Sequence, residues 1–279
     1  MSKIAISTGS LPRLEGKQFY ELDSVVRMMR RFLKESKVDG FEFVLLPEWD
    51  SENAPLTPTS APFECEKHTV DEVFEALQGH DFPILSVHAN RDIGNYLCSL
   101  DETLKNKGVR LIDECINFTR KVGSRICVFH FWDAWKESLD LQYLKSVYDR
   151  FQAAYSDVEV SVENIPTKHL GGSPFHVMRC FRYKTLDLKW ASMYNEFDAF
   201  ANVLGEVDNV HIQGRLEAGQ IVPTTGNLDV RHALTRIRVS GYSGLFAVEL
   251  EGKPACGAVL AYLEKLKKLV SLKARFVAF

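Results

Sequence analysis

The sequence predicts an α/β protein that folds as a single (β/α)8 TIM barrel, and three observations support this prediction. Short β-rich runs alternate eight times with runs of helical periodicity, which is typical of a parallel sheet covered by helices. No GxGxxG or P-loop motif follows any β-rich run, so the common signatures of an open nucleotide-binding sheet are missing. The 279 residues contain no linker-like stretch, and barrels of this length occur as one domain. We therefore expect one TIM-barrel domain over residues 1–279.

The first four units each pair a β-rich run with a helical run. In the first helical run the apolar residues Val25, Met29 and Phe32 recur at helical spacing. The third helical run ends at Gly123, and glycine is typical of helix C-termini. We expect strands at 3–7, 40–46, 82–89 and 125–131, and helices at 21–36, 69–79, 100–123 and 139–155.

The last four units follow the same order. In the run VEVSVEN, Val158, Val160 and Val162 alternate with polar residues, which indicates a strand with one apolar face. We expect strands at 158–164, 183–188, 209–213 and 245–251, and helices around 174–181, 196–206, 228–241 and 257–274.

Two segments that follow predicted strands are long and lack periodicity. They are residues 47–68, which contain four prolines, and residues 213–227. Loops of this length are uncommon unless they cover a functional site. Both lie on the C-terminal side of the predicted strands, where barrel enzymes have their active sites. We therefore expect the functional site at that end of the barrel.

Composition narrows the class of partner. The net charge of −3 gives no sign of a basic polymer-binding surface, so nucleic acid is a partner that we do not favour. No apolar window reaches the roughly 20 residues that span a bilayer, and the N-terminal run is too broken for a signal peptide. The six cysteines form no CxxC pair, which predicts free thiols and a cytoplasmic location. The apolar C-terminal run 269–279 either completes the last helix or packs on a second copy, which leaves a homo-oligomer open.

Four residues that can bind a metal each close a successive apolar run: Glu163, Asp187, His211 and Glu249. In a closed parallel barrel the C-terminal strand ends converge on one point. A buried carboxylate is costly unless it is paired or metal-bound, and each residue taken alone is more simply explained as a helix cap or an ion-pair partner. Four such residues at equivalent positions predict a metal site at the mouth of the barrel.

His88 and His130 close the two preceding β-rich runs and extend this series to six residues. A lone histidine at a strand end is usually a core residue whose hydrogen bonds are satisfied. The functional interpretation of these two histidines therefore also depends on the convergence of the strands. A mixed set of histidines and carboxylates suits Zn²⁺, Mn²⁺, Co²⁺ or Fe²⁺ better than Ca²⁺. We expect a divalent metal ion, Zn, Mn or Co, with one or two ions per chain.

The motifs at these strand ends resemble those of the xylose isomerase-like TIM barrel superfamily. That superfamily includes the tagatose and psicose 3-epimerases and endonuclease IV. The resemblance covers the barrel from the third predicted strand to the eighth. It rests on HAN at 88–90, VFH at 128–130, SVEN at 161–164, LD at 186–187, VHIQG at 210–214 and VELEG at 248–252.

The resemblance to the epimerase branch implies one divalent metal held by Glu163, Asp187, His211 and Glu249. It also implies that Glu163 and Glu249 are a catalytic acid/base pair on opposite sides of a ketose carbon. A metal that polarises carbonyl and hydroxyl oxygens lowers the cost of an enediolate, and flanking carboxylates can move the proton. The expected function is a sugar isomerase or epimerase acting on a small ketose, polyol-derived or sugar-acid substrate.

The resemblance to the endonuclease IV branch implies a second metal, held by His88, His130 and a bridging Glu163. The outer ligands of that branch have no match here. Trp190 stands where a histidine is needed, and residues 213–227 contain neither Asp nor His. The alternative function is therefore a two-metal phosphodiester or phosphate hydrolase without the third metal. A second alternative is a barrel that only binds a sugar-like ligand.

Five further residues are candidates for substrate contact, and each has an ordinary structural explanation as well. Arg215 follows His211 on the long loop and is otherwise a solvated arginine. The tryptophans are candidate apolar walls for a sugar face or ordinary packing residues, and the histidine is a candidate loop contact. The set is Arg215, Trp132, Trp135, Trp190 and His169. Glu42, in the middle of the second predicted strand, is best explained as a member of a buried ion pair.

Overall fold

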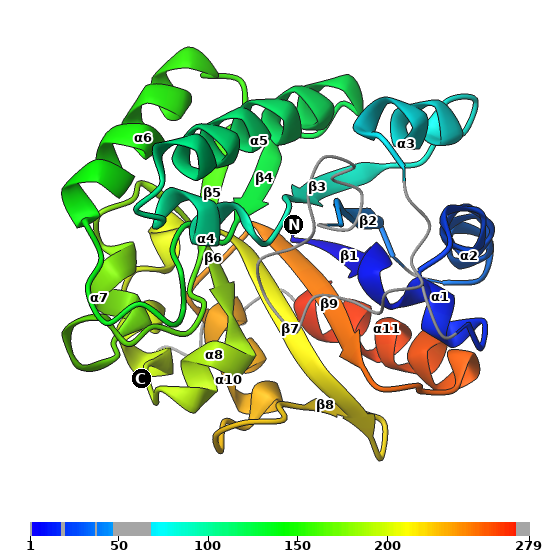
Figure 1. Cartoon of the computed structure of the whole chain (residues 1–279). Helices are drawn as coiled ribbons and strands as arrows, with labels where there is room; N and C mark the ends of the chain where they lie inside the picture. The colour runs from blue at the N-terminus through cyan, green and yellow to red at the C-terminus, as the bar shows by residue number, and fades with distance from the viewer. Residues whose placement is uncertain (1, 18–19, 37, 47–67, 272–279) are drawn as a thin grey trace.

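Eight parallel strands close into a barrel, which confirms the predicted (β/α)8 fold (Figure 1). The computed structural model describes residues 2–17, 20–36, 38–46 and 68–271. Each strand pairs with the next along the chain, and the last pairs in parallel with the first. The barrel strands are β1 (Lys3–Ser7), β2 (Gly40–Val44), β3 (Ile84–His88), β4 (Ile126–Phe129), β5 (Glu159–Glu163), β6 (Tyr183–Asp187), β7 (Val207–Glu217) and β9 (Leu245–Glu251).

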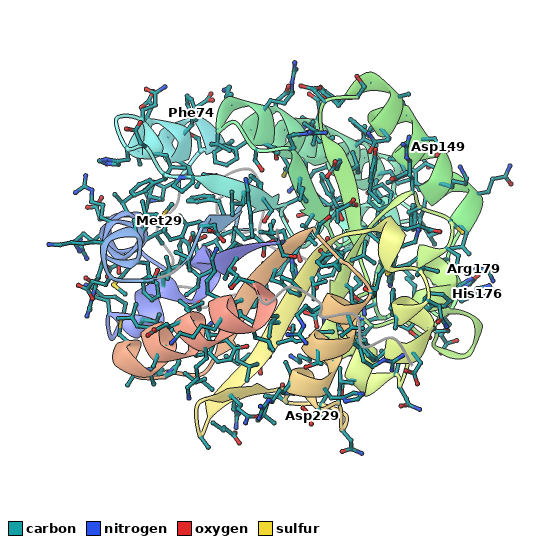
Figure 2. The ribbon with its side chains drawn as sticks, turned by 180° about the vertical axis from the view of Figure 1, so that it is seen from behind. Met29, Phe74, Asp149, His176, Arg179 and Asp229 are labelled. Carbon is teal, nitrogen blue, oxygen red and sulfur yellow. The ribbon has the colours of Figure 1, made fainter. Side chains whose placement is uncertain are left out.

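The helices surround this barrel, and their apolar faces pack on the strands. On α2, Met29 is fully buried against the barrel, whereas Asp149 of α6 and Asp229 lie on the outer surface (Figure 2). The helix that was expected to stop at Gly123 ends at Lys121, and Gly123 has a φ of +73°. The longer helices are α2 (Leu22–Glu35), α3 (Val70–Leu77), α5 (Glu102–Lys121), α6 (Leu141–Ala154), α10 (Val230–Val239) and α11 (Cys256–Ser271).

Several short helices depart from the sequence prediction. Only one turn of helix, α9 (Phe197–Ala201), and a 3-10 turn at Leu204–Glu206 form where one helix was expected over 196–206. A further short helix starts directly after Asp187, because that side chain accepts hydrogen bonds from two backbone N–H groups and caps it. The short helices are α1 (Leu11–Leu14), α4 (Ile93–Leu97), α7 (Pro174–Met178), α8 (Leu188–Met193) and α9.

Part of the predicted loop 213–227 is a β-hairpin. β7 continues to Glu217 and turns back into β8 (Gln220–Val222), which pairs with it in antiparallel register. Ala218 and Gly219 form the turn with φ values of +47° and +75°, and a two-residue hairpin turn of this type needs positive φ at both positions. The expectation of an irregular loop was therefore wrong here. The other long loop, 47–68, lies outside the described residues except for His68.

The strands place apolar side chains outward and polar side chains inward. Val160 and Val162 of β5 belong to the large core between barrel and helices, while Ser161 and Glu163 point to the other face. Toward the N-terminal end of the barrel interior, Ala5, Leu245 and Ala247 form a small separate apolar cluster. Above that layer most of the inward side chains are polar and buried, so the fold itself directs polar side chains toward the C-terminal mouth.

Among the described residues, no helix is long and apolar enough to cross a membrane. The cysteines within the described ranges are free thiols: Cys98, Cys115, Cys127, Cys180 and Cys256. Cys65 and the C-terminal residues from 272 onward lie outside the part of the chain that the structure describes.

Candidate metal centre

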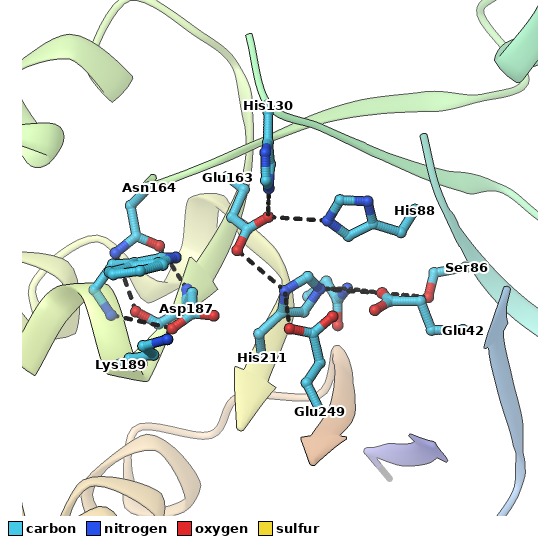
Figure 3. A network of polar contacts seen from close by, with 12 residues as sticks. Glu42, Ser86, His88, His130, Glu163, Asn164, Asp187, Lys189, His211 and Glu249 are labelled. Atoms are coloured by element: carbon cyan, nitrogen blue, oxygen red, sulfur yellow. Dashed lines mark hydrogen bonds and ion pairs between the residues drawn. The ribbon is translucent and has the colours of Figure 1, made fainter. Parts of the chain in front are cut away.

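The six predicted ligands come together at the C-terminal ends of six neighbouring strands (Figure 3). His88, Glu163 and Asp187 are the last residues of β3, β5 and β6, and His130 directly follows β4. His211 lies beside Asp187 because the two are register partners on β7 and β6. All are buried except His130 and Glu249, which are half-buried. The mouth of the barrel thus holds three carboxylates and three imidazoles.

Glu163 lies between two groups of candidate ligands. Its Oε2 atom is 3.2 Å from His88 Nε2 and 3.0 Å from His130 Nε2. Its Oε1 atom is 3.4 Å from His211 Nδ1. The two oxygens of one carboxylate therefore face opposite sides, which is the arrangement of a bridging ligand.

Three sets of three residues place one donor atom each within 4.8 Å of the others. Glu163 belongs to two of these sets and His211 belongs to two. The sets are His88, His130 and Glu163; Glu163, Asp187 and His211; and Glu42, His211 and Glu249. The overlap of the sets shows one continuous cluster and not separate surface pairs.

Asp187 has one oxygen in use and one free. Its Oδ1 atom accepts hydrogen bonds from the backbone N–H groups of Lys189 at 2.6 Å and Trp190 at 3.1 Å. Asn164 holds the Asp187 backbone, because its side-chain oxygen accepts the Asp187 N–H and its amide donates to the Asp187 carbonyl. The Oδ2 atom is buried and has no hydrogen-bond partner among the described residues. The sequence allowed Asp187 to be a helix cap, and the cap uses only one of its two carboxylate oxygens.

Glu249 is the most solvent-exposed carboxylate of the cluster. Its side chain is 17% exposed, compared with 2% for Glu163. Its Oε2 atom is 3.8 Å from His211 Nδ1. Glu163 and Glu249 therefore lie on either side of the same imidazole nitrogen, and one of the two carboxylates is more accessible from the mouth.

Glu42 contacts the other nitrogen of His211. Its Oε2 atom is 3.1 Å from His211 Nε2 and also accepts hydrogen bonds from Ser86 and Asn209, each at 2.8 Å. Glu42 and His211 are completely buried. The sequence correctly suggested a buried partner for Glu42 but gave no sign of which one. Asn164, Ser86 and Asn209 were not predicted as site residues, although Ser86 and Asn209 lie two positions before His88 and His211, on the same inward faces of their predicted strands.

Burial and mutual attraction shift the pKa values of this cluster in opposite directions. Burial raises the pKa of Glu249 to about 7, against the attraction of His211. Burial also raises the pKa of Asp187 well above its usual range. For Glu163, the attraction of His211 and His130 outweighs burial and holds the pKa well below the usual value. Glu163 in turn raises the pKa of His88 to about 9, although burial opposes this.

The residues present fit a divalent cation. With Glu42, four carboxylates lie in one mostly buried region, and among the described residues the positive charges in direct contact with Glu163 are those that the histidines can carry. His211 Nδ1 and Asp187 Oδ2 are both buried and lack hydrogen-bond partners within the described ranges. Histidine nitrogen and carboxylate oxygen are common donors to Zn²⁺, Mn²⁺ and Co²⁺. Such a cation would satisfy both atoms and balance the negative charge.

The predicted substrate contacts lie in different surroundings. Trp190 is half-buried beside Asp187, with Lys189 Nζ 4.3 Å from the centre of its ring. Lys189 also forms an ion pair with Glu251 at 2.5 Å. Arg215 is exposed on β7, opposite Glu251 of β9. Trp190 and Arg215 therefore flank the strand ends that carry Asp187 and Glu249.

The other three predicted contacts are engaged elsewhere. Trp132 is 1% exposed and donates its indole N–H to the Pro166 carbonyl. Gly94 packs so closely on it that a Cβ atom there would lie 2.4 Å from the Trp132 carbonyl oxygen. His169 is buried, and its Nδ1 accepts the backbone N–H of Leu139. Trp135 is 67% exposed, with Lys168 over its ring.

A family model described as xylose isomerase-like TIM barrel matches residues 31–271. The chain belongs to this family. The resemblance inferred from the strand-end motifs is therefore confirmed. No curated protein sequence matches the chain significantly.

Solved structures with the same fold include sugar epimerases and an AP endonuclease relative. An L-ribulose 3-epimerase has a TM-score of 0.62 at 15% identity, over 99% of this chain and 100% of that one. D-allulose 3-epimerase from Methylomonas sp., in complex with D-allulose, has a TM-score of 0.64 at 13% identity, over 96% of each chain. An AP endonuclease, family 2, from Brucella melitensis has a TM-score of 0.60 at 14% identity, over 95% of this chain and 99% of that one. At these identities the likeness shows the shared fold.

Proposed function

We propose that the protein is a divalent-metal-dependent sugar isomerase or epimerase. Its substrate would be a small ketose, a polyol-derived sugar or a sugar acid, and the reaction would pass through an enediolate. The observation that carries this proposal is the convergence of Glu163, Asp187, His211 and Glu249, in which a buried nitrogen and a buried oxygen lack partners among the described residues. The epimerases among the structures of the same fold give it further support.

Each member of the quartet has a distinct role in this proposal. Asp187 Oδ2 and His211 Nδ1 would hold a Zn, Mn or Co ion together with Glu163 and Glu249. The ion supplies a Lewis acid that polarises the substrate carbonyl. Glu163 and Glu249 flank the His211 nitrogen from two sides, so one would remove the proton next to the carbonyl and the other would return one.

Of the five predicted substrate contacts, Trp190 and Arg215 lie nearest to the proposed metal ligands, and we propose that both contact the substrate. Trp190 presents a half-buried ring next to Asp187, where an apolar sugar face could lie. Arg215 has an exposed guanidinium close to Glu251, at the outer edge of the mouth. Trp132, Trp135 and His169 stay predictions, with the first and last already hydrogen-bonded to the backbone.

Proton exchange at carbon tests this function directly. Purified protein loaded with Mn²⁺, Co²⁺ or Zn²⁺ is incubated in deuterated water with a panel of ketoses and sugar acids, and deuterium incorporation is followed by NMR. We expect exchange next to the carbonyl of at least one substrate. Glu249→Gln is the control, because loss of the proton-transferring carboxylate should lower the rate by about 10²–10⁴. Absence of exchange across the panel would reject the isomerase or epimerase.

The second candidate is a two-metal phosphodiester or phosphate hydrolase, and a specific observation favours it. His88 and His130 both contact the Glu163 oxygen that faces away from His211. These two histidines complete a second set of donors that a one-metal site does not need. Metal analysis of zinc-saturated protein separates the candidates, because two ions per chain favour the hydrolase and one ion excludes it. Binding of a sugar without any turnover would instead indicate the non-catalytic barrel.

The remaining proposals concern partners and location. We propose a small sugar-like substrate, whereas nucleic acid is not favoured by the net charge of −3. The free thiols of the described residues are consistent with a reducing cytoplasm. A homo-oligomer stays open, since the apolar run proposed to contact a second copy extends beyond the described residues.

A further inference from the structure

Glu42 is a completely buried carboxylate on the second strand, away from the open mouth. A buried carboxylate without a function is costly unless its hydrogen bonds satisfy it. Here Ser86 and Asn209 donate to one oxygen, Oε2, which also lies 3.1 Å from His211 Nε2. The other oxygen, Oε1, has no hydrogen-bond partner in the described part of the chain. Among the described residues, the contacts of the Glu42 carboxylate are therefore all on the oxygen that faces His211, and its other oxygen is not satisfied.

The contact of Glu42 with His211 bears on which nitrogen of His211 keeps a proton when the other one binds a cation. If Nε2 lacked a proton, its lone pair would face the Glu42 carboxylate oxygen at 3.1 Å, and the two would repel. A proton on Nε2 removes this repulsion and donates a hydrogen bond to the carboxylate. Asn209 Nδ2 lies 3.0 Å from the same nitrogen and 2.8 Å from Glu42 Oε2, but these two atoms are only 3.1 Å apart, too close together for both N–H bonds of one amide to point at them. The arrangement favours the proton on Nε2.

The opposite nitrogen is then available to bind a cation. His211 Nδ1 points to the side where Glu163 and Glu249 lie, at 3.4 Å and 3.8 Å (Figure 3). An imidazole that donates from one nitrogen to a carboxylate is a more basic and better oriented ligand through the other. Glu42 and the Glu163–Glu249 pair thus contact the two ends of one ring.

We propose that Glu42 is the positioning residue of His211: it holds the ring as the Nε2–H tautomer and presents Nδ1 to the metal. This inference rests on the metal site of the proposed function. Ser86 and Asn209 support it by holding the accepting oxygen of Glu42 from two further strands, β3 and β7. A purely structural ion pair would need neither a free nitrogen on the far side of the ring nor an orientation toward other carboxylates.

The experiment compares metal affinity in three variants and the wild-type protein. Glu42→Ala removes the acceptor, and Glu42→Gln keeps its shape and one accepting oxygen while removing the charge. Ser161→Ala is the matched control, because Ser161 is a buried interior residue that hydrogen-bonds Thr185 and does not contact His211. Co²⁺ affinity is measured by calorimetry and the bound ion by its visible absorption spectrum. Thermal unfolding checks that each variant is folded.

We expect Glu42→Ala to bind Co²⁺ about 100-fold more weakly and Glu42→Gln about 10-fold more weakly, with an altered absorption spectrum. Ser161→Ala should keep the wild-type affinity and spectrum. Equal affinity of wild type and both Glu42 variants would overturn the inference and leave the metal site standing. The same loss in Ser161→Ala would also overturn it, since the effect would then be general destabilisation. A wild-type protein that binds no metal would reject the site itself.

Discussion

The two ends of β6 carry buried charges that the protein treats differently. At the start of the strand, the Lys184 ammonium bonds the Phe181 carbonyl at 2.6 Å, the Arg182 carbonyl at 3.4 Å and Glu206 at 2.6 Å. At the end of the strand, Asp187 has one oxygen bonded and one buried without a partner within the described ranges. Lys184 is saturated by its own protein, whereas Asp187 is not.

We interpret this difference as one between charges that stabilise the fold and charges that our proposal assigns to a metal. A buried polar group is normally hydrogen-bonded, so an unsatisfied one in a native fold needs an explanation. At the N-terminal end of β6, the protein supplies the partners of Lys184. Toward the C-terminal end, Asp187 and His211 each have one buried atom without a hydrogen-bond partner among the described residues. The comparison predicts that substitutions at the first end change stability and that those at the second change metal binding and turnover.

The largest expected effect is that of Glu163→Gln at the C-terminal end. The substitution removes the carboxylate that contacts three histidines. We expect metal binding to weaken strongly and deuterium exchange to fall by about 10²–10⁴. Glu206→Gln is the matched change at the other end, where the side chain is 58% exposed, and it should leave the exchange rate unchanged. Equal rates in Glu163→Gln and wild type would break the comparison.

Lys184→Met tests the N-terminal end. The substitution keeps the approximate length of the side chain but leaves the buried Phe181 carbonyl and the Arg182 carbonyl without their donor, while Glu206 stays solvated. We expect the free energy of unfolding to fall by about 1–3 kcal/mol. Urea denaturation measures this loss, and the metal affinity of the folded protein should stay at the wild-type value. Weaker metal binding with unchanged stability would show that the two ends are not separate in function.

Asp208 gives the N-terminal end a pH dependence that can be measured. Burial, and then the negative charge of Glu159, raises its pKa to about 7. An unfolded aspartate has a pKa of about 3.9, so between about pH 4 and pH 7 the folded state holds a proton that the unfolded state has lost. Stability from this group is therefore present below about pH 4 and is lost as the pH rises through 7.

Asp208→Asn should remove this dependence. The amide oxygen can still accept the Lys184 backbone N–H, which is 3.2 Å from the Asp208 carboxylate. We expect the variant to exceed wild type by about 1–2 kcal/mol in unfolding free energy at pH 8, because a partly solvated group gives less than its full pKa shift. The two proteins should be equal at pH 4. A variant that is less stable at pH 8 would contradict the assigned direction.

The sequence predicted the barrel and the grouping of the strand-end residues, because both follow from the eightfold repetition of a strand followed by a helix. Once eight strands close in parallel, Glu163, Asp187 and His211 must lie near one another whatever their exact side-chain angles. The role of these residues as metal ligands stays a prediction. What the sequence could show for Asp187 was only a choice between a ligand and a helix cap, and the structure shows one oxygen in the cap and the other free.

Features that depend on a close tertiary approach could not be predicted. The sequence left Trp132 open between an apolar wall for a sugar and an ordinary packing residue, and its backbone packs tightly on Gly94, where a Cβ atom would not fit. The partner of Glu42 is a histidine 169 positions later in the chain, which no local pattern indicates. The hairpin at Ala218 and Gly219 was missed because only one of its two turn residues is a glycine.

The smallest effect is expected for Arg215→Ala at the outer edge of the mouth. Arg215 is exposed and opposite Glu251, with no part in the buried cluster. If it contacts the substrate, its loss should raise KM about 5- to 10-fold with little change in kcat, because a contact made equally in ground and transition states affects binding alone. Arg236→Ala is the matched control, since that arginine pairs with Asp198 on the outer helices. An unchanged KM in Arg215→Ala would show that Arg215 does not contact the substrate. Substrate recognition would then be left to Trp190 and the quartet of Glu163, Asp187, His211 and Glu249.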